Sequence, residues 1–165
     1  MTGSDIDATL IDILRRDRTI AMVGASAKWN RPSNFVMKYL QGKGYRVIPV
    51  NPGIAGQEIL GETVYASLND IPCPFDMVDI FRNSEAAGAI TDEAIALAAE
   101  KGIKTIWMQL TVINENAAAR ADQAGLHCIM DRCVKIEYGR LFGELGWGGV
   151  NTGVISSKRL KLGVR

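Results

Sequence analysis

An apolar run ends at a glycine and passes into a loop of small residues with two cations in the stretch Thr19-Ile20-Ala21-Met22-Val23-Gly24-Ala25-Ser26-Ala27-Lys28-Trp29-Asn30-Arg31-Pro32. A helical pattern then begins at Pro32-Ser33-Asn34. This order predicts a buried strand, a glycine turn and a helix N-terminus, an arrangement in which turn amides and the helix dipole favour an anion. An ordinary strand–loop–helix connection remains the alternative, because glycine turns are common in α/β domains.

The rest of the chain alternates strands and helices in the same way. Strands are expected over residues 19–23, 45–50, 76–81, 103–108 and 126–130. Helices are expected after a Ser4 cap, over Phe35, Val36, Tyr39 and Leu40, from a Ser84 cap to Lys101, and from an Asn114 cap to about Ala124. Apolar strands separated by helices predict an α/β fold, with a mostly parallel sheet of about five strands covered on both faces. The fold is therefore expected to be a three-layer sandwich.

Length, composition and charge predict one compact domain over residues 1–165. The chain has 165 residues, 47% of them hydrophobic and 22% charged, and a net charge of +1. This balance argues against a general nucleic-acid surface. No apolar stretch is long enough to cross a membrane. The polar N-terminus does not resemble a signal peptide, and three cysteines without a CxxC pair suggest reduced thiols in the cytoplasm.

In parallel sheets of this kind, ligands bind at the carboxyl ends of the strands. A dinucleotide fingerprint there would carry three glycines and an acidic residue at the end of the second strand. Here Ser26 and Trp29 replace the second and third glycines, and the second strand ends in Asn51-Pro52. The missing carboxylate weakens the case for NAD and leaves NADP or coenzyme A (CoA) open. The sequence also lacks a Walker-type G-x-x-x-x-G-K-[ST] motif.

Five short motifs, in this order, resemble those of the small bacterial CoA-binding proteins. They are Val23-Gly24-Ala25-Ser26, Val50-Asn51-Pro52, Val78-Asp79-Ile80-Phe81-Arg82, Ile106-Trp107-Met108-Gln109 and Met130-Asp131-Arg132-Cys133. Members of that family are single Rossmann-like domains, similar to the nucleotide-binding domain of the succinyl-CoA synthetase alpha subunit. The resemblance covers roughly residues 8–137, while the glycine-rich tail over residues 138–165 goes beyond it.

The resemblance implies that CoA is the cofactor and that its ADP end lies across the strand tips. Gly24 would let the ligand approach the backbone of the turn closely. Ser26 would offer its hydroxyl and its N–H to the diphosphate. Lys28 and Arg31 would neutralise phosphate charge, although they could instead be solvated loop cations. We expect a branched side chain at Gly24 to stop binding and to leave the fold largely intact.

Further roles fall on the loops after the later strands. Asn51-Pro52 would line the ribose or adenine, unless they only end a strand. Phe81 and Arg82 would flank the cofactor, unless Phe81 belongs to the core, and Gln109 would hydrogen-bond near it. The full set of expected cofactor-binding residues is Gly24, Ala25, Ser26, Lys28, Arg31, Asn51, Pro52, Phe81, Arg82 and Gln109.

Catalytic chemistry has little support in the sequence. The only histidine, His127, falls at the start of the fifth strand, opposite the expected site, and Cys133 is more simply a buried thiol. No cluster has metal-ligand spacing. We therefore expect a non-catalytic or regulatory CoA-binding protein, taking CoA or acyl-CoA. An NADP-linked oxidoreductase, an acyl-CoA-handling partner subunit and an interaction protein that lost its ligand remain alternatives, and a protein partner or homo-oligomer stays open.

Overall fold

The structure is a computed structural model that describes residues 3–143. The glycine-rich stretch around Trp147, expected to belong to the tail, lies outside the described residues. The described part forms two compact units, one of residues 17–132 and the other of residues 3–16 with 133–143. The expected sheet lies in the first of these.

Five parallel strands form the main sheet, in the order β2-β1-β5-β6-β7. The expected α/β fold with a parallel sheet is confirmed, although several strands are shorter than expected. Pro49 lies within β2 and is tolerated there because β2 is an edge strand of this sheet. The strands are β1 (Thr19–Val23), β2 (Arg46–Val50), β5 (Met77–Ile80), β6 (Thr105–Met108) and β7 (His127–Ile129).

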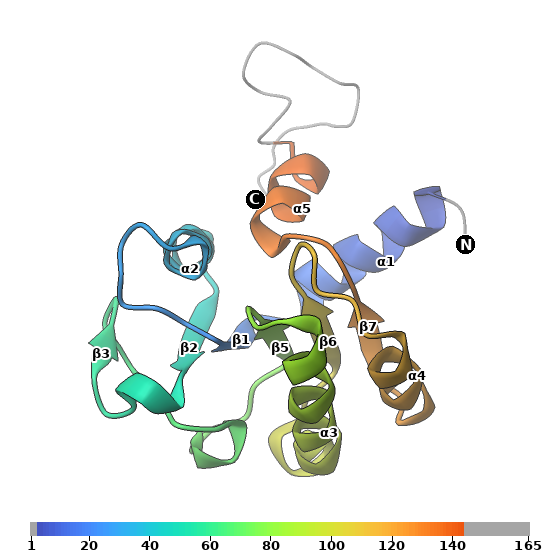
Figure 1. Cartoon of the computed structure of the whole chain (residues 1–165). Helices are drawn as coiled ribbons and strands as arrows, with labels where there is room; N and C mark the ends of the chain where they lie inside the picture. Colours follow the sequence, from blue (N-terminus) through green and yellow to red (C-terminus); the bar gives the residue numbers. More distant parts are fainter. Residues whose placement is uncertain (1–2, 144–165) are drawn as a thin grey trace. The chain divides into compact units, whose positions relative to one another are not determined.

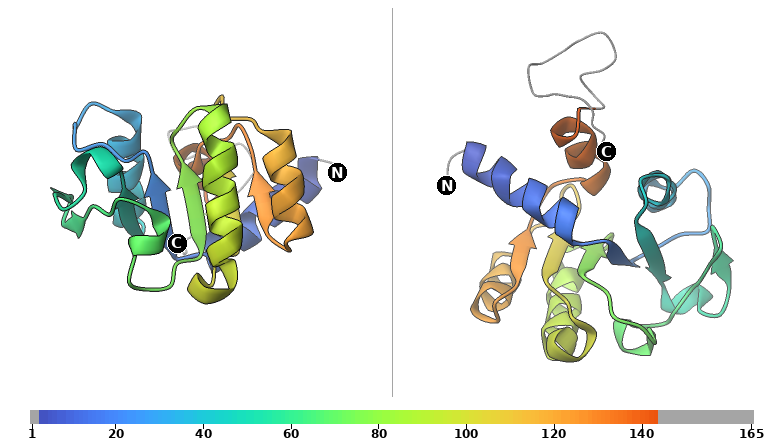
Figure 2. Two further views of the ribbon diagram at one scale, coloured as in Figure 1. Left: turned by 60° about the horizontal axis from the view of Figure 1, so that its bottom comes forward. Right: turned by 180° about the vertical axis from the view of Figure 1, so that it is seen from behind.

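Helices cover both faces of this sheet (Figures 1 and 2). Helix α2 (Pro32–Gly42) lies on one face, and α3 (Ser84–Lys101) and α4 (Glu115–Gln123) lie on the other. The segment between β2 and β5 forms no long helix, as its glycines and prolines predict. It contains the short antiparallel pair β3 (Glu58–Ile59) and β4 (Glu62–Thr63), with 3-10 turns at Pro52–Ile54 and Leu68–Asp70.

The core between the sheet and helices α3 and α4 explains why the strand sequences are largely continuous apolar runs. Alternate strand residues such as Ala21, Val78 and Ile106 pack with Ala87 and Leu97 of α3 in one buried cluster. The intervening strand residues are buried as well. A parallel sheet buried on both faces needs apolar side chains at successive positions, which is the pattern that the sequence shows.

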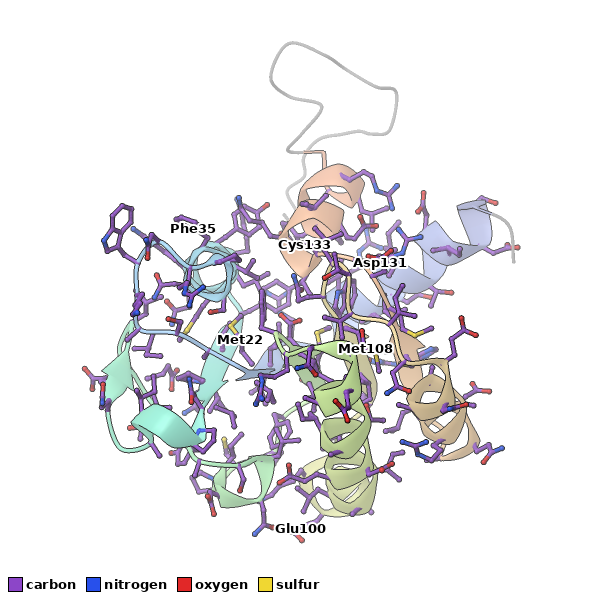
Figure 3. All side chains as sticks on the ribbon, viewed as in Figure 1. Met22, Phe35, Glu100, Met108, Asp131 and Cys133 are labelled. Atoms are coloured by element: carbon purple, nitrogen blue, oxygen red, sulfur yellow. The ribbon has the colours of Figure 1, made fainter. Side chains whose placement is uncertain are left out.

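Two expectations for the helices are wrong. Phe35 was expected on the apolar face of its helix, but it is 50% exposed, and Met37 is buried instead. Figure 3 shows Phe35 on α2, whereas Met22 of β1 lies within the sheet. Helix α3 is capped by Asn83, whose Oδ1 accepts from the amide of Ala86 at 2.7 Å, and not by Ser84. The cap at Asn114 is confirmed.

The second unit contains α1 (Gly3–Arg16) and α5 (Val134–Leu141). Helix α1 begins at Gly3, so Ser4 lies within it rather than before it. Sequence analysis did not predict α5. Its Arg140 donates to both Asp7 and Glu137 at 2.7 Å, which joins the two helices of this unit. No helix within residues 3–143 is long and apolar enough to span a bilayer.

Candidate nucleotide-binding site

The strand order reverses between β1 and β5. The chain continues from β1 to β2 on one side, whereas β5, β6 and β7 follow on the other side of β1. In open α/β sheets, ligands bind in the crevice outside the carboxyl ends of the strands at such a point. The loops that follow Val23 and Ile80 both start there, and they define the candidate site.

Gly24 brings the ends of β1 and β5 into close contact. Its φ is +89°, and a Cβ atom on it would lie 2.9 Å from the carbonyl carbon of Phe81 and closer still to the carbonyl oxygen. The glycine is therefore required by the packing of one strand end on another. The expectation that a branched residue at Gly24 leaves the fold largely intact is wrong, because the added atoms would meet backbone.

The side chain of Arg82 lies against the same glycine. Its Cδ atom is 3.1 Å from the position that a Cβ of Gly24 would take. The aliphatic stem of Arg82 thus covers the turn, while the residue as a whole remains exposed. A long cationic side chain commonly packs its stem and keeps its head in water. The structure therefore brings Arg82 to the loop that follows β1.

Several amides of this loop already have acceptors. Gly24 N and Ala25 N both approach Val50 O, at 2.9 and 3.4 Å. Ser26 N donates to Ser33 Oγ at 3.1 Å, so this amide, expected to serve a diphosphate, is engaged within the protein. The amides of the loop that donate to none of the residues 3–143 are those of Ala27, Trp29 and Asn30.

Two residues that sequence analysis did not select hold the loop to α2. Ser33 accepts the hydrogen bond from Ser26 N, and Asn34 Nδ2 donates to Ser26 O at 3.0 Å. Both side chains belong to buried residues, although they lie in the first turn of a helix. Ser26 Oγ in turn accepts from Lys28 N at 3.1 Å. The sequence signal for these contacts was the presence of two small polar residues directly after Pro32. Such side chains, when buried at the start of a helix, need hydrogen-bond partners, and the preceding loop supplies them.

Asn51 ties the end of β2 to this loop. Its Nδ2 donates to Ala25 O at 2.9 Å, and its Oδ1 accepts from Gly53 N at 2.9 Å. The amide side chain that was expected to line a ribose or adenine therefore holds two backbone segments in place. Pro52, the next residue, begins a 3-10 turn and is exposed.

The cations around the loop differ from most others in the described chain. Several other cations pair with carboxylates, as Lys104 does with Asp76, Arg46 with Glu62 and Arg120 with Asp92, at N–O distances of 2.6, 3.2 and 2.7 Å. Lys28, Arg31 and Arg82 are exposed, and none forms an ion pair or hydrogen bond through its side chain with residues 3–143. The same holds for Lys38 on α2. Three cations without carboxylate partners thus lie on the two loops of the candidate site.

The remaining predicted residues lie in different surroundings. Phe81 is half-buried, so it does not belong fully to the core. Gln109 is buried directly after β6, and its backbone N–H donates to Ile80 O at 3.3 Å. Cys133 is buried, as expected for an unreactive thiol. His127 is exposed at the first position of β7, where it pairs with Thr105 at the amino end of β6.

The loops after β6 and β7 carry two non-glycine residues with positive φ, Thr111 at +70° and Asp131 at +58°. Asp131 Oδ1 accepts from Thr111 N at 2.7 Å, and Asp131 N donates to Val112 O. These contacts hold both loops in conformations that L-residues rarely adopt. Asp131 is an exposed residue, so this part of the strand-end rim carries an acidic side chain.

A buried carboxyl group lies in the central strand β5. Asp79 is fully buried, and neither of its side-chain oxygens has a hydrogen-bond partner among residues 3–143. In the sheet register it pairs with Met22 of β1 and Trp107 of β6, which are also fully buried. Burial raises the pKa of Asp79 well above its ordinary value. No group of His, Cys, Asp and Glu residues within residues 3–143 could hold a metal ion.

Strand order, helix placement and the glycine turn together define a Rossmann-like α/β domain with its candidate site at the carboxyl ends of β1 and β5. Comparison with known protein families gives the narrower class. The CoA binding domain family matches residues 18–139, and the chain belongs to that family. The resemblance inferred from the five motifs is thereby confirmed.

Individual relatives match most of the chain. The uncharacterised protein YneT of Bacillus subtilis (strain 168) is 37% identical over 131 residues, which cover 79% of this chain and 93% of YneT. A hypothetical protein from Pyrococcus horikoshii OT3 has a structure that is 41% identical, with a TM-score of 0.75, covering 82% of this chain and 91% of its own. A Thermus thermophilus protein is 34% identical with a TM-score of 0.74, covering 86% and 100%.

A more distant match shows the fold alone. It is the dinucleotide-forming acetyl-coenzyme A synthetase 1 of Ca. Korarchaeum cryptofilum, in complex with phosphate and ADP. This protein is 22% identical, with a TM-score of 0.59. The match covers 72% of this chain but only 26% of the synthetase, so the fold occurs there within a much larger chain.

Proposed function

We propose that this protein binds CoA and that the ADP part of CoA lies over the loop of residues 24–31, at the carboxyl ends of β1, β2 and β5. The observation that carries the proposal is the set of three cations on the two loops of the site. Lys28, Arg31 and Arg82 have no carboxylate partners among residues 3–143. A ligand with a diphosphate and a 3′-phosphate supplies the anions that these side chains lack.

The backbone of the loop complements these side chains in the proposed complex. The amides of Ala27, Trp29 and Asn30 have no acceptor among the described residues, and they are available to phosphate oxygens. Ser26 Oγ accepts from Lys28 N, which leaves its hydroxyl hydrogen to donate. The loop is held by Ser33 and Asn34 before a ligand arrives, so little ordering is required on binding.

The end of β2 favours CoA over NAD in this proposal. Asn51 is neutral, and its side chain is occupied by Ala25 O and Gly53 N. A carboxylate at this position would bind the diol of an unmodified ribose and repel a phosphorylated one. Pro52 is exposed beside it and offers an apolar surface to the ribose or adenine.

The proposed role is binding without catalysis. The only histidine in the sequence, His127, lies at the amino end of β7, whereas the candidate site lies at the carboxyl ends of the strands. Cys133 is buried. The groups that face the loop are cations, amides and hydroxyls, which bind phosphate.

Substitution of the site cations tests the proposal. A charge-assisted hydrogen bond contributes about 1.5–3 kcal/mol, so Arg31→Ala and Arg82→Ala should each weaken CoA binding by about tenfold to a hundredfold. Lys38→Ala is the matched control, because it removes another exposed cation without a partner among the described residues, but one on α2 outside the loops. Calorimetric titration with CoA gives the dissociation constants.

Circular dichroism and thermal unfolding establish that each variant is folded. The proposal fails if folded Arg31→Ala and Arg82→Ala bind CoA as tightly as the wild type. It also fails if Lys38→Ala weakens binding to the same extent, because the effect would then reflect net charge and not the site.

A further inference from the structure

Trp29 is the most exposed large apolar side chain among the described residues. It is 77% exposed, while the next, Phe35 and Leu110, are each 50% exposed. Solvent exposure on this scale leaves the indole with little packing to stabilise the fold. A single exposed apolar side chain is common on protein surfaces, so what distinguishes Trp29 is how its loop is held and which charges lie beside it.

The exposure of Trp29 does not follow from a loosely held loop. Arg31 N donates to Lys28 O at 3.1 Å, which closes a turn with Trp29 and Asn30 at its two central positions. Lys28 N is held by Ser26 Oγ, and Ser26 is held by Ser33. A tight turn anchored on both sides therefore presents the indole to solvent.

The charges on either side of Trp29 identify the kind of ligand that fits. Lys28 precedes it and Arg31 closes its turn, and neither side chain forms an ion pair or hydrogen bond with residues 3–143. An occupant of this surface should combine a flat aromatic group with phosphates nearby. CoA has one such group, the adenine, with the 3′-phosphate and the diphosphate attached through the same ribose.

We infer that the indole of Trp29 is the platform on which the adenine of bound CoA stacks. The inference rests on the proposed function and extends it, because it assigns the base to a residue outside the family motifs that carried the assignment. Lys28 and Arg31 would hold the phosphates on either side of the ribose while Trp29 covers one face of the purine. Stacking of a base on an aromatic side chain is favourable for any purine.

Three ligands separate stacking from phosphate binding: CoA, adenosine 3′,5′-bisphosphate, which retains the adenine, and 4′-phosphopantetheine, which lacks it. A stacked base contributes about 1–3 kcal/mol, or about fivefold to a hundredfold in affinity. Trp29→Ala should lose this factor for CoA and for the bisphosphate and bind 4′-phosphopantetheine as the wild type does. Trp29→Phe should retain most of the affinity, and Phe35→Ala is the matched control for loss of an exposed aromatic ring.

Fluorescence provides an independent readout. CoA should quench the emission of the wild type through Trp29, and that contribution to the quenching should be lost in Trp29→Phe even though CoA still binds. Trp107 is fully buried and should not respond directly to a ligand at this loop.

The outcomes distinguish this inference from the proposed function. If the wild type does not bind CoA, both fall. If the wild type binds CoA and Trp29→Ala binds each of the three ligands as tightly as the wild type does, only the inference falls. An equal loss for 4′-phosphopantetheine would assign the effect to the loop as a whole, and a change in oligomeric mass in Trp29→Ala would assign the indole to contact with a second copy. Either result overturns the stacking role.

Discussion

Replacement of Gly24 by alanine should destabilise the fold more than the same replacement at a glycine that has only a positive φ. A non-glycine residue in the left-handed region costs about 1–2 kcal/mol, and Gly24 has a φ of +89°. The new Cβ would also lie 2.9 Å from the carbonyl carbon of Phe81, and overpacking of this kind costs about 1–3 kcal/mol. The expected total is about 2–5 kcal/mol, a large part of the stability of a typical domain.

Gly102 provides a matched control for the cost of the left-handed backbone conformation. Its φ is +79°, and nothing lies within 4 Å of the position that its Cβ would take. Gly102→Ala should therefore carry only the cost of the left-handed conformation, about 1–2 kcal/mol. Urea unfolding of both variants, with unchanged slope against denaturant, measures the difference. The reasoning is refuted if Gly24→Ala is as stable as Gly102→Ala, because the contact with Phe81 would then cost nothing.

Two further predictions concern the buried and strained residues. Because the pKa of Asp79 is raised by burial, the native state binds its proton more tightly than the unfolded chain, and stability should fall as pH rises above about pH 4. Asp79→Asn should flatten that decline in urea unfolding between about pH 5 and about pH 8, and an equal decline in both proteins would show that Asp79 is not its source. Thr111→Gly should raise the free energy of unfolding by about 1 kcal/mol. Thr111 has a φ of +70°, and its hydrogen bonds with residues 3–143 use only its own backbone N–H and carbonyl oxygen. A less stable variant would contradict this account of strain.

The strands and their order of appearance could be predicted from the sequence because the relevant signals are local. Runs such as residues 20–23 are apolar at every position, and glycines or prolines end them. A strand buried on both faces requires this composition wherever it lies in the sheet. The same signals gave the parallel α/β fold, and five short motifs gave the family.

Features that depend on tertiary contacts could not be predicted in this way. Phe35 and Met37 are both apolar and lie two positions apart, and only the docking of α2 decides which is buried. Gly24 was expected to let a ligand approach the turn closely, whereas the group that the structure places against it is the Phe81 backbone, from a distant part of the chain. The side chain of Asn51 is likewise engaged by Ala25, across two loops.

Titration of the wild-type protein with CoA and with NAD, under identical conditions in a calorimeter, tests the central claim most directly. The side chains of Lys28, Arg31 and Arg82, which have no carboxylate partner among residues 3–143, and the neutral Asn51 predict tighter binding of CoA. The affinity should weaken as salt screens the phosphate contacts. Binding of NAD as tight as or tighter than that of CoA, or no binding of CoA at all, would contradict the account.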